Sequence, residues 1–265
     1  MIASLSRIVA MMHRYTLLLA SSWPRLLELA YWPMMQIFVW GTLQLYLSEQ
    51  FSSFAKISGT LVGGVLLFDV LVRGQLGLSV TFLEETWSNN LGNLLMSPLR
   101  PIELVAAMMA MSLARTLIGL APVTLVAIFL FDFNVYQLGF WLLAFFLNLI
   151  ATSWAIGLIV SGLVLRHGAA VESLAWSVVF ALLPLCCVYY PVSILPQWVQ
   201  PISLCLAPTY VFEGLRAVLL ERTFHAELMW RALGLNTLYL AAAFWGFLRL
   251  LESARASGSL LADGG

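Results

Sequence analysis

Six long runs of apolar residues dominate this sequence of 265 residues. A helix that crosses a bilayer needs about 20 mostly apolar residues, because each residue advances the helix by about 1.5 Å. The runs occupy residues 31–47, 57–82, 104–131, 138–165, 171–190 and 228–251. Only 10% of the residues are charged, against roughly 25% in an ordinary soluble domain. The sequence therefore predicts an all-α integral membrane protein with six transmembrane helices.

Residues 1–25 predict an amphipathic helix that lies at the membrane surface. One helical face carries its polar residues: Arg7, Arg14, Ser21 and Arg25. Another face carries apolar side chains: Leu5, Ile8, Met12, Tyr15 and Leu19. We expect the arginines to point toward anionic lipid headgroups, with the apolar face turned to the membrane. No short apolar run here ends in a small-residue cleavage site, so the segment is expected to be retained.

Six spans would place both chain ends on the same side of the membrane. With the N-terminus inside, the cytoplasmic segments carry these arginines: Arg7, Arg14, Arg25, Arg100, Arg166, Arg249 and Arg255. The outer segments carry Lys56, Arg216 and Arg222. Cytoplasmic loops are typically richer in Lys and Arg, so both termini are predicted to be cytoplasmic. Residues 1–252 form one transmembrane domain, and the small, polar residues 253–265 predict a disordered cytoplasmic tail.

Residues 191–227 fit neither a water-exposed loop nor one spanning helix. The segment is apolar but interrupted by proline, at Pro191, Pro196, Pro201 and Pro208. After Pro208 a helical pattern resumes, and this helix carries Tyr210, Glu213 and Arg216. Irregular backbone at membrane depth is tolerated where neighbouring protein shields it. We therefore predict a re-entrant segment in the outer half of the membrane.

Two charged residues, Asp69 and Arg73, lie inside the second apolar run. They are four residues apart on one helical face, where they can form an ion pair. A lone charge near the bilayer centre costs about 2.5–3.5 kcal/mol on insertion scales. The pair either holds helices together or lines a pathway or gate, and the sequence leaves both open. In the third run, Arg115 has three candidate partners near the inner surface: Glu84, Glu85 and Glu103.

The densest polar cluster of the chain separates the second and third runs. One helical face of this stretch carries Leu83, Trp87, Leu91, Leu94 and Leu95, and the remainder carries Glu84, Glu85, Ser88, Asn89, Asn90 and Asn93. Pro98 and Pro101 then end the helix, because proline removes a hydrogen-bond donor. This amphipathic helix of residues 84–97 either floats on the membrane or is presented to a soluble partner. Basic residues that would bind anionic lipid are absent before Arg100, which favours a partner.

Several classes of function are disfavoured by the composition. Positive and negative residues balance at 13 each, so no basic surface is available for nucleic acid. His13, His167 and His225 lie in separate segments, and no H-E-x-x-H pattern predicts a metal site. No G-x-x-x-x-G-K-[ST] phosphate loop surrounds Lys56, so the chain is not expected to hydrolyse ATP. An intramembrane enzyme is disfavoured because no nucleophile has a histidine partner nearby.

The motifs resemble those of permease subunits in the ABC-2 type exporter family. In that family an acidic residue follows the second span, an amphipathic helix then ends in Leu-Leu-x-Ser/Thr-Pro-Leu, and Glu-Leu begins the third span. The matching positions are Glu84 or Glu85, residues 94–99 and residues 103–104. A second match comprises Leu-Pro-x-Trp-x-Gln at 195–200, Pro-Thr-Tyr at 208–210 and acidic-x-x-Arg at 213–216. Family members often carry Gly-Thr where this chain has Asn89 and Asn90.

The resemblance implies an exporter driven by a separate ATP-binding cassette ATPase. It makes residues 84–96 the coupling helix that docks into the ATPase, with these contact candidates: Glu84, Glu85, Trp87, Asn89, Asn90, Leu91 and Asn93. It also implies a homodimer in a bacterial inner membrane with two ATPase chains, which bind the ATP and Mg²⁺. Asp69 and Arg73 would lie in or beside the pathway. The family carries drugs, lipids, lipid-linked glycans and polysaccharides.

An ion-coupled secondary transporter that uses Asp69, Arg73 and Arg115 is the alternative reading. Such transporters are built from repeated halves with matched broken helices near the bilayer midplane. Only the C-terminal half of this sequence contains a proline-broken segment. The exporter is therefore the favoured function.

Overall fold

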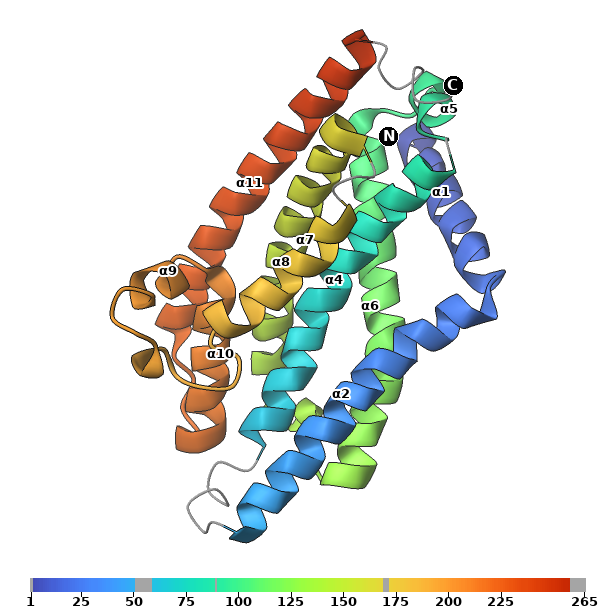
Figure 1. Cartoon of the computed structure of the whole chain (residues 1–265). Helices are drawn as coiled ribbons and strands as arrows, with labels where there is room; N and C mark the ends of the chain where they lie inside the picture. Colours follow the sequence, from blue (N-terminus) through green and yellow to red (C-terminus); the bar gives the residue numbers. More distant parts are fainter. Residues whose placement is uncertain (1, 51–58, 89, 169–171, 258–265) are drawn as a thin grey trace.

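The computed structural model shows a chain built from α-helices that run mostly side by side (Figure 1). It describes residues 2–50, 59–88, 90–168 and 172–257, and no β-strand occurs among them. In chain order the α-helices are α1 (Ile2–Ala20), α2 (Trp23–Gln50), α4 (Thr60–Trp87), α5 (Leu91–Met96), α6 (Pro101–Phe131), α7 (Phe140–His167), α8 (Glu172–Leu185), α9 (Gln200–Leu204), α10 (Ala207–Arg216) and α11 (Ala226–Ser257). Short helical turns are η1 (Val135–Leu138), η3 (Val192–Ile194) and the π-helical η4 (Ala217–Glu221).

Helix α4 is the central helix of the bundle. It packs against α2, α6, α7, α8 and α10. Its side chains are apolar on nearly all sides, as expected for a helix surrounded by protein. Small residues bring α7 close to it: a Cβ added at Gly157 would lie 3.0 Å from the Cβ of Leu78. In lipid, where the hydrophobic effect does not drive helices together, such close packing is a main source of stability.

Four helices of the described residues are long and apolar enough to cross a membrane, namely α4, α6, α7 and α11. The sequence predicted six spans, and the first and fifth are not established by length and composition. Helix α2 has 28 residues, about 42 Å of helix, but glutamines and interfacial aromatic residues lower its hydropathy. Helix α8 has 14 residues, about 21 Å, which is short of the roughly 30 Å hydrocarbon layer.

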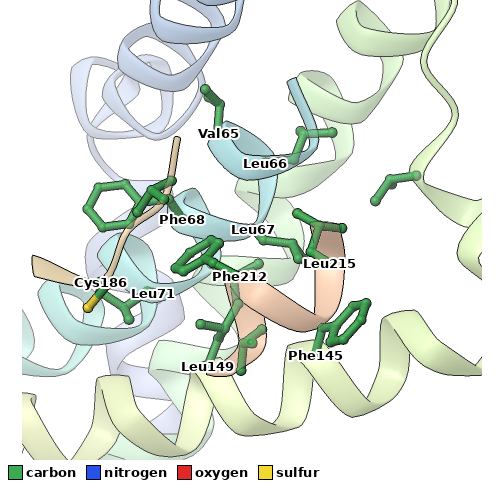
Figure 2. Close-up of a cluster of buried hydrophobic side chains, with 14 of the residues drawn as sticks. Val65, Leu66, Leu67, Phe68, Leu71, Phe145, Leu149, Cys186, Phe212 and Leu215 are labelled. Atoms are coloured by element: carbon green, nitrogen blue, oxygen red, sulfur yellow. The ribbon is translucent and has the colours of Figure 1, made fainter. Parts of the chain in front are cut away.

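The buried apolar side chains form two separate cores. The first gathers residues 62–71 of α4 around α10, α7 and the segment after α8; Figure 2 shows Phe212 and Leu215 of α10 among α4 side chains, with Phe145 of α7 beside them. The second core joins α1, α5 and the last turns of α11 to residues 78–83 of α4. Helix α4 thus contributes to both cores and connects them.

Buried polar residues lie between the two cores. Ser112 of α6 donates to the carbonyl of Gly74 on α4 at 2.6 Å. Ser153 of α7 donates to the carbonyl of Leu71 at 2.9 Å. Farther across the bundle, Thr152 donates to the amide oxygen of Asn236 on α11 at 2.6 Å. These bonds satisfy polar groups that lipid could not, and they fix the register of four helices against one another.

One end of the bundle carries the start of α1, α5, the first turn of α6 and the last turns of α11, at the top in Figure 1. We call it the α5 end. Helix α11 continues to Ser257, so the predicted disordered tail of residues 253–265 is wrong for its first five residues. Residues 258–265 lie outside the described part of the chain. The helix persists because Leu251 and Ala254 are buried at this end.

Residues 186–221 form short helices and turns rather than one long helix. After α8 ends, the chain passes through η3, α9, α10 and η4 before α11 begins. Helix α10 packs against α4, α7 and α11. The helical pattern expected after Pro208 is α10, which has proline at its start, where a missing N–H costs nothing. Helix α10 is therefore covered by protein, whereas the turns before it are largely exposed, with Ile194 68% and Trp198 76% exposed.

Candidate functional site

Glu103, in the first turn of α6, joins α1 to the bundle. Its carboxylate accepts hydrogen bonds from Arg7 Nε at 2.8 Å and Arg7 Nη2 at 2.6 Å. Ser4 Oγ donates to it at 2.6 Å, and the backbone N–H of Arg100 donates at 3.0 Å. The hydrogen bond with Glu103 raises the pKa of Arg7 above its ordinary value, so this guanidinium stays charged. The start of α1 is thus anchored to the start of α6.

Glu85, in the last turn of α4, binds two other elements at once. Arg14 of α1 donates to both of its oxygens, from Nη1 at 2.7 Å and Nη2 at 3.0 Å. Asn90, just before α5, donates from Nδ2 at 2.7 Å. Such bidentate, charge-assisted bonds are among the strongest that side chains form. One buried carboxylate therefore holds α1, α4 and the start of α5 together, and we call Arg14, Glu85 and Asn90 the Glu85 relay.

Arg115 of α6 pairs with Glu84, one of the three partners that the sequence offered. Its Nη2 lies 3.3 Å from Glu84 Oε2, and both side chains are largely buried. The adjacent glutamates thus face different neighbours, since Glu84 binds α6 and Glu85 binds α1 and Asn90. The end of α4 is held on two sides.

The helix predicted to couple to an ATPase is shorter than the sequence indicated. The sequence predicted one helix over residues 84–97, but α4 ends at Trp87 and α5 spans only Leu91–Met96. Glu84, Glu85 and Trp87 therefore belong to α4, and the helix breaks where Asn90 turns its amide to Glu85. Asn89 lies outside the described residues.

Exposure also divides the predicted contact residues. Glu85 and Leu91 are buried, so they face the protein and not a partner. Trp87 was expected on the apolar inner face but is 49% exposed. Asn93 is exposed, and Met96 is 71% exposed. The surface that α5 and the end of α4 offer to a partner is therefore partly apolar: Trp87, Asn93 and Met96.

Helix α1 turns its arginines toward the bundle and not outward, and two side chains of its predicted membrane face, Tyr15 and Leu19, are buried in the second core. Arg7 and Arg14 bind glutamates of the bundle and not lipid headgroups, and the side chain of Arg25 is not described. The exposed side of α1 is instead apolar, with Leu5, Val9 and Leu17. The prediction failed because Glu85 and Glu103 compete with lipid for the arginines and hold them with fixed geometry.

Asp69 and Arg73 form the predicted i,i+4 pair on α4. Arg73 Nε lies 2.5 Å from Asp69 Oδ2, and both side chains are buried. The guanidinium lies against α6, where a Cβ added at Gly119 would come within 1.9 Å of Arg73 Nη1. Arg73 Nη2 has no hydrogen-bond partner among the described residues. Asp69 lies within the stretch of α4 that forms the first core, and Arg73 lies between this stretch and the second core.

Glu213 and Arg216 of α10 organise the segment that follows α8. Glu213 Oε1 accepts a hydrogen bond from the backbone N–H of Val192 at 2.8 Å. Arg216 Nη1 donates to the carbonyl of Cys187 at 2.7 Å, a residue with a positive φ of 55°. The two charges also pair with each other at 2.9 Å. They therefore fix an irregular stretch of backbone that no regular ladder stabilises.

Aromatic hydroxyls satisfy further carbonyls of this segment. Tyr210 donates to Leu204 at 2.8 Å, and Tyr239 of α11 donates to Cys205 at 2.8 Å. Pro208 lies in the first turn of α10 and is buried. Backbone groups at membrane depth need such partners, because no water replaces them. The predicted residues Pro208, Tyr210, Glu213 and Arg216 thus lie together on one helix that shapes the segment.

Most of the chain matches one known protein family. The profile of the ABC-2 type transporter family matches residues 7–220. The chain belongs to the ABC-2 type transporter family. No curated protein sequence matches it. As a member of this family, the chain is an integral membrane protein and the permease of a transporter. Permeases of the family work with an ATP-binding cassette protein. In the described part of the chain, no group of three His, Cys, Asp or Glu residues is placed to hold a metal ion.

Sequence reasoning missed the contacts of α1 in this ABC-2 permease. Arg7 and Glu103 are 96 residues apart, and Arg14 and Glu85 are 71 apart. A signal was present, because two arginines seven residues apart share a helical face and the predicted inner surface held more glutamates than Arg115 alone can pair. The sequence also contained no sign that Asn90 would donate a hydrogen bond to Glu85.

Proposed function

We propose that this permease is the membrane-spanning half of an ATP-driven exporter. Two copies assemble with two ATP-binding cassette ATPase chains, which hold the ATP and Mg²⁺ and carry out hydrolysis. The chain is not itself an enzyme. The α5 end and both termini face the cytoplasm of a bacterial inner membrane, and the cargo is a drug, lipid, lipid-linked glycan or polysaccharide.

The Glu85 relay is the observation that carries this proposal. A coupling element transmits force only when it is fixed to the helices that it moves. Glu85 is bonded to Asn90 at 2.7 Å and to Arg14 at 2.7 and 3.0 Å. A displacement of α5 therefore moves α4 and α1 together instead of being absorbed by the connection between α4 and α5.

The exposed surface of Trp87, Asn93 and Met96 is the contact for the ATPase. Two large exposed apolar side chains at the end of a membrane bundle suit a protein cleft better than water. Closure of the ATPase dimer on ATP pushes this surface and favours one of two exposures of the pathway, as a rigid-body transition biased by nucleotide. Asp69 and Arg73 then lie on the helix that transmits the movement.

The contacts of Arg115 support the exporter over an ion-coupled transporter. The alternative requires Asp69, Arg73 and Arg115 to share an ion site. Arg115 instead pairs with Glu84 at 3.3 Å, and Asp69 pairs with Arg73 on its own helix. Through Glu84, Arg115 links α6 to the end of α4, which suits a role in transmitting movement from the ATPase.

Copurification with candidate ATPase chains tests the proposed function. The permease should retain one ATPase and stimulate its hydrolysis in vesicles, and Trp87→Ala combined with Met96→Ala should reduce this stimulation. Phe129→Ala is the matched control, because Phe129 is 80% exposed at the opposite end of α6. The proposal fails if no ATPase is retained, or if the α5 variants and the control stimulate equally.

A further inference from the structure

A groove follows the outer side of α7, between α8 and α11. Its volume is about 430 Å³. The floor is α7 from Thr152 to Leu163, and the walls include Val178 of α8 and Gly246 of α11. Ile159 on the floor is 52% exposed, so the groove is open along its side. It is separate from the Glu85 relay and from Asp69 and Arg73.

The groove is long and narrow enough to hold a single extended chain. Eleven helical steps from Thr152 to Leu163 span about 16 Å. A volume of about 430 Å³ over that length gives a mean cross-section of about 27 Å². A single hydrocarbon chain therefore fits along the groove.

The lining is apolar along its length. Tyr239 lies at the end away from α5, but its hydroxyl already donates to the carbonyl of Cys205 at 2.8 Å. Thr152 at the same end donates to Asn236 at 2.6 Å. The polar groups that line the groove are thus satisfied internally, and the lining offers little to a polar ligand.

Two arginines stand at the opposite end of the groove. Arg166 follows Ile159 and Leu163 along α7, at spacings of seven and three that keep one helical face. Arg249 follows Ala242 and Gly246 along α11 in the same way. Both are exposed, and neither forms an ion pair with a described residue. The nearest acidic residues in sequence, Glu252 on α11 and Glu172 on α8, are not paired with them.

We propose that the groove binds one acyl chain of an anionic phospholipid, whose phosphate lies between Arg166 and Arg249. Arg249 also contacts the ring of Trp245, 5.5 Å from the ring centroid. The chain fills the apolar trough and the headgroup meets positive charge at the α5 end. The assignment of the α5 end to the cytoplasmic leaflet rests on the proposed function. The binding of the lipid in the groove does not rest on it.

Native mass spectrometry of the detergent-purified permease tests the site. The protein is titrated with phosphatidylglycerol or phosphatidylcholine that carry identical acyl chains. Each arginine near a membrane surface contributes about 1 kcal/mol toward anionic lipid, so two arginines give about a thirtyfold preference for phosphatidylglycerol. Retention within about twofold for the two lipids would overturn the proposal.

Gly246→Leu distinguishes lipid that is bound in the groove from lipid that is bound elsewhere on the protein surface. A Cβ at Gly246 meets nothing within 4 Å, so leucine fits there and fills the groove. Gly234→Leu is the matched control, because Gly234 also meets nothing, lies on the same helix and does not line the groove. Gly246→Leu should release bound phosphatidylglycerol, and Gly234→Leu should retain it. Equal retention by both contradicts a groove site.

Arg166→Gln with Arg249→Gln tests the headgroup contact. This double variant should lose the preference between the two lipids, whereas Arg222→Gln with Arg231→Gln should keep it. The same spectra report the mass of any dimer: if Gly246→Leu changes the dimer and not the lipid, a second copy covers the groove and the proposal is wrong. No ATPase is needed, so this test and that of the proposed function fail independently.

Discussion

Replacing Arg14 with Gln should destabilise the protein more than replacing Glu85 with Gln. The two side chains share one ion pair but are unequally buried, at 37% exposed for Arg14 and 2% for Glu85. Arg14→Gln leaves a carboxylate inside the protein that keeps the hydrogen bond from Asn90 and the neighbouring hydroxyl of Tyr15. Glu85→Gln leaves a guanidinium that can turn to water. The cost therefore depends on which partner remains.

The magnitudes follow from this asymmetry. Removing one partner of a buried pair costs about 3–5 kcal/mol, and the remaining bond from Asn90 places Arg14→Gln near the lower end, at about 3 kcal/mol. Glu85→Gln loses hydrogen bonds to a charged group and should cost about 1.5–2 kcal/mol, because partial exposure of Arg14 discounts the ion pair. The double variant leaves no buried charge and should also cost about 1.5–2 kcal/mol. Adding Glu85→Gln to Arg14→Gln should thus restore about 1 kcal/mol of the stability that Arg14→Gln removes.

Thermal unfolding in detergent, followed by tryptophan fluorescence, measures these differences. At about 2–4 °C per kcal/mol for a chain of this size, Arg14→Gln should lower Tm by about 6–12 °C and the double variant by clearly less. His13→Gln, an exposed position on the same helix, is the control. If the two single variants are equal, or the double variant is their sum, the burial argument is refuted.

Three further substitutions test other contacts. Gly119→Ala should cost about 2–3 kcal/mol in thermal unfolding, because its methyl group would meet Arg73. Arg216→Met removes a charge-assisted bond to the Cys187 carbonyl, so maleimide should label Cys187 about tenfold faster when the other cysteines are absent; unchanged labelling would contradict the anchoring role. Asp69→Asn should stop export while assembly persists, and unchanged export would make the Asp69 pair purely structural.

The helices that the sequence predicted best are those surrounded by apolar neighbours or lipid. The runs 57–82, 104–131, 138–165 and 228–251 correspond to α4, α6, α7 and α11 within a few residues. Their apolar character is continuous, so no local sequence signal favours a structure other than a long helix. The run 171–190 is equally apolar, but its helix ends at Leu185, after Pro184. Composition cannot distinguish a span from a shorter helix followed by turns, because both are buried in apolar surroundings.

In the candidate site, contacts between residues close in the sequence were predictable, and contacts between distant residues were not. The Asp69–Arg73 pair was predictable, since spacing alone places it on one face. The Glu85 relay was not, because it depends on how α1 docks against the end of α4. The continuous apolar spacing across residues 83–95 also concealed the break before α5. That break forms because the Glu85 carboxylate offers Asn90 a stronger partner than a helical position does.

Helix α4 couples the α5 end to the segment that follows α8. At one end it is fixed to α1 and Asn90 through Glu85. At the other, Gly64 lies so close to the segment after α8 that an added Cβ would be 3.0 Å from the Val188 carbonyl. Neighbouring α4 side chains interlock with Phe212 of α10. A push on α5 cannot slide α4 past these contacts, because close-packed interfaces shift between discrete arrangements instead of deforming continuously. Movement of the α5 surface therefore requires the segment held by Glu213 and Arg216 to move as well.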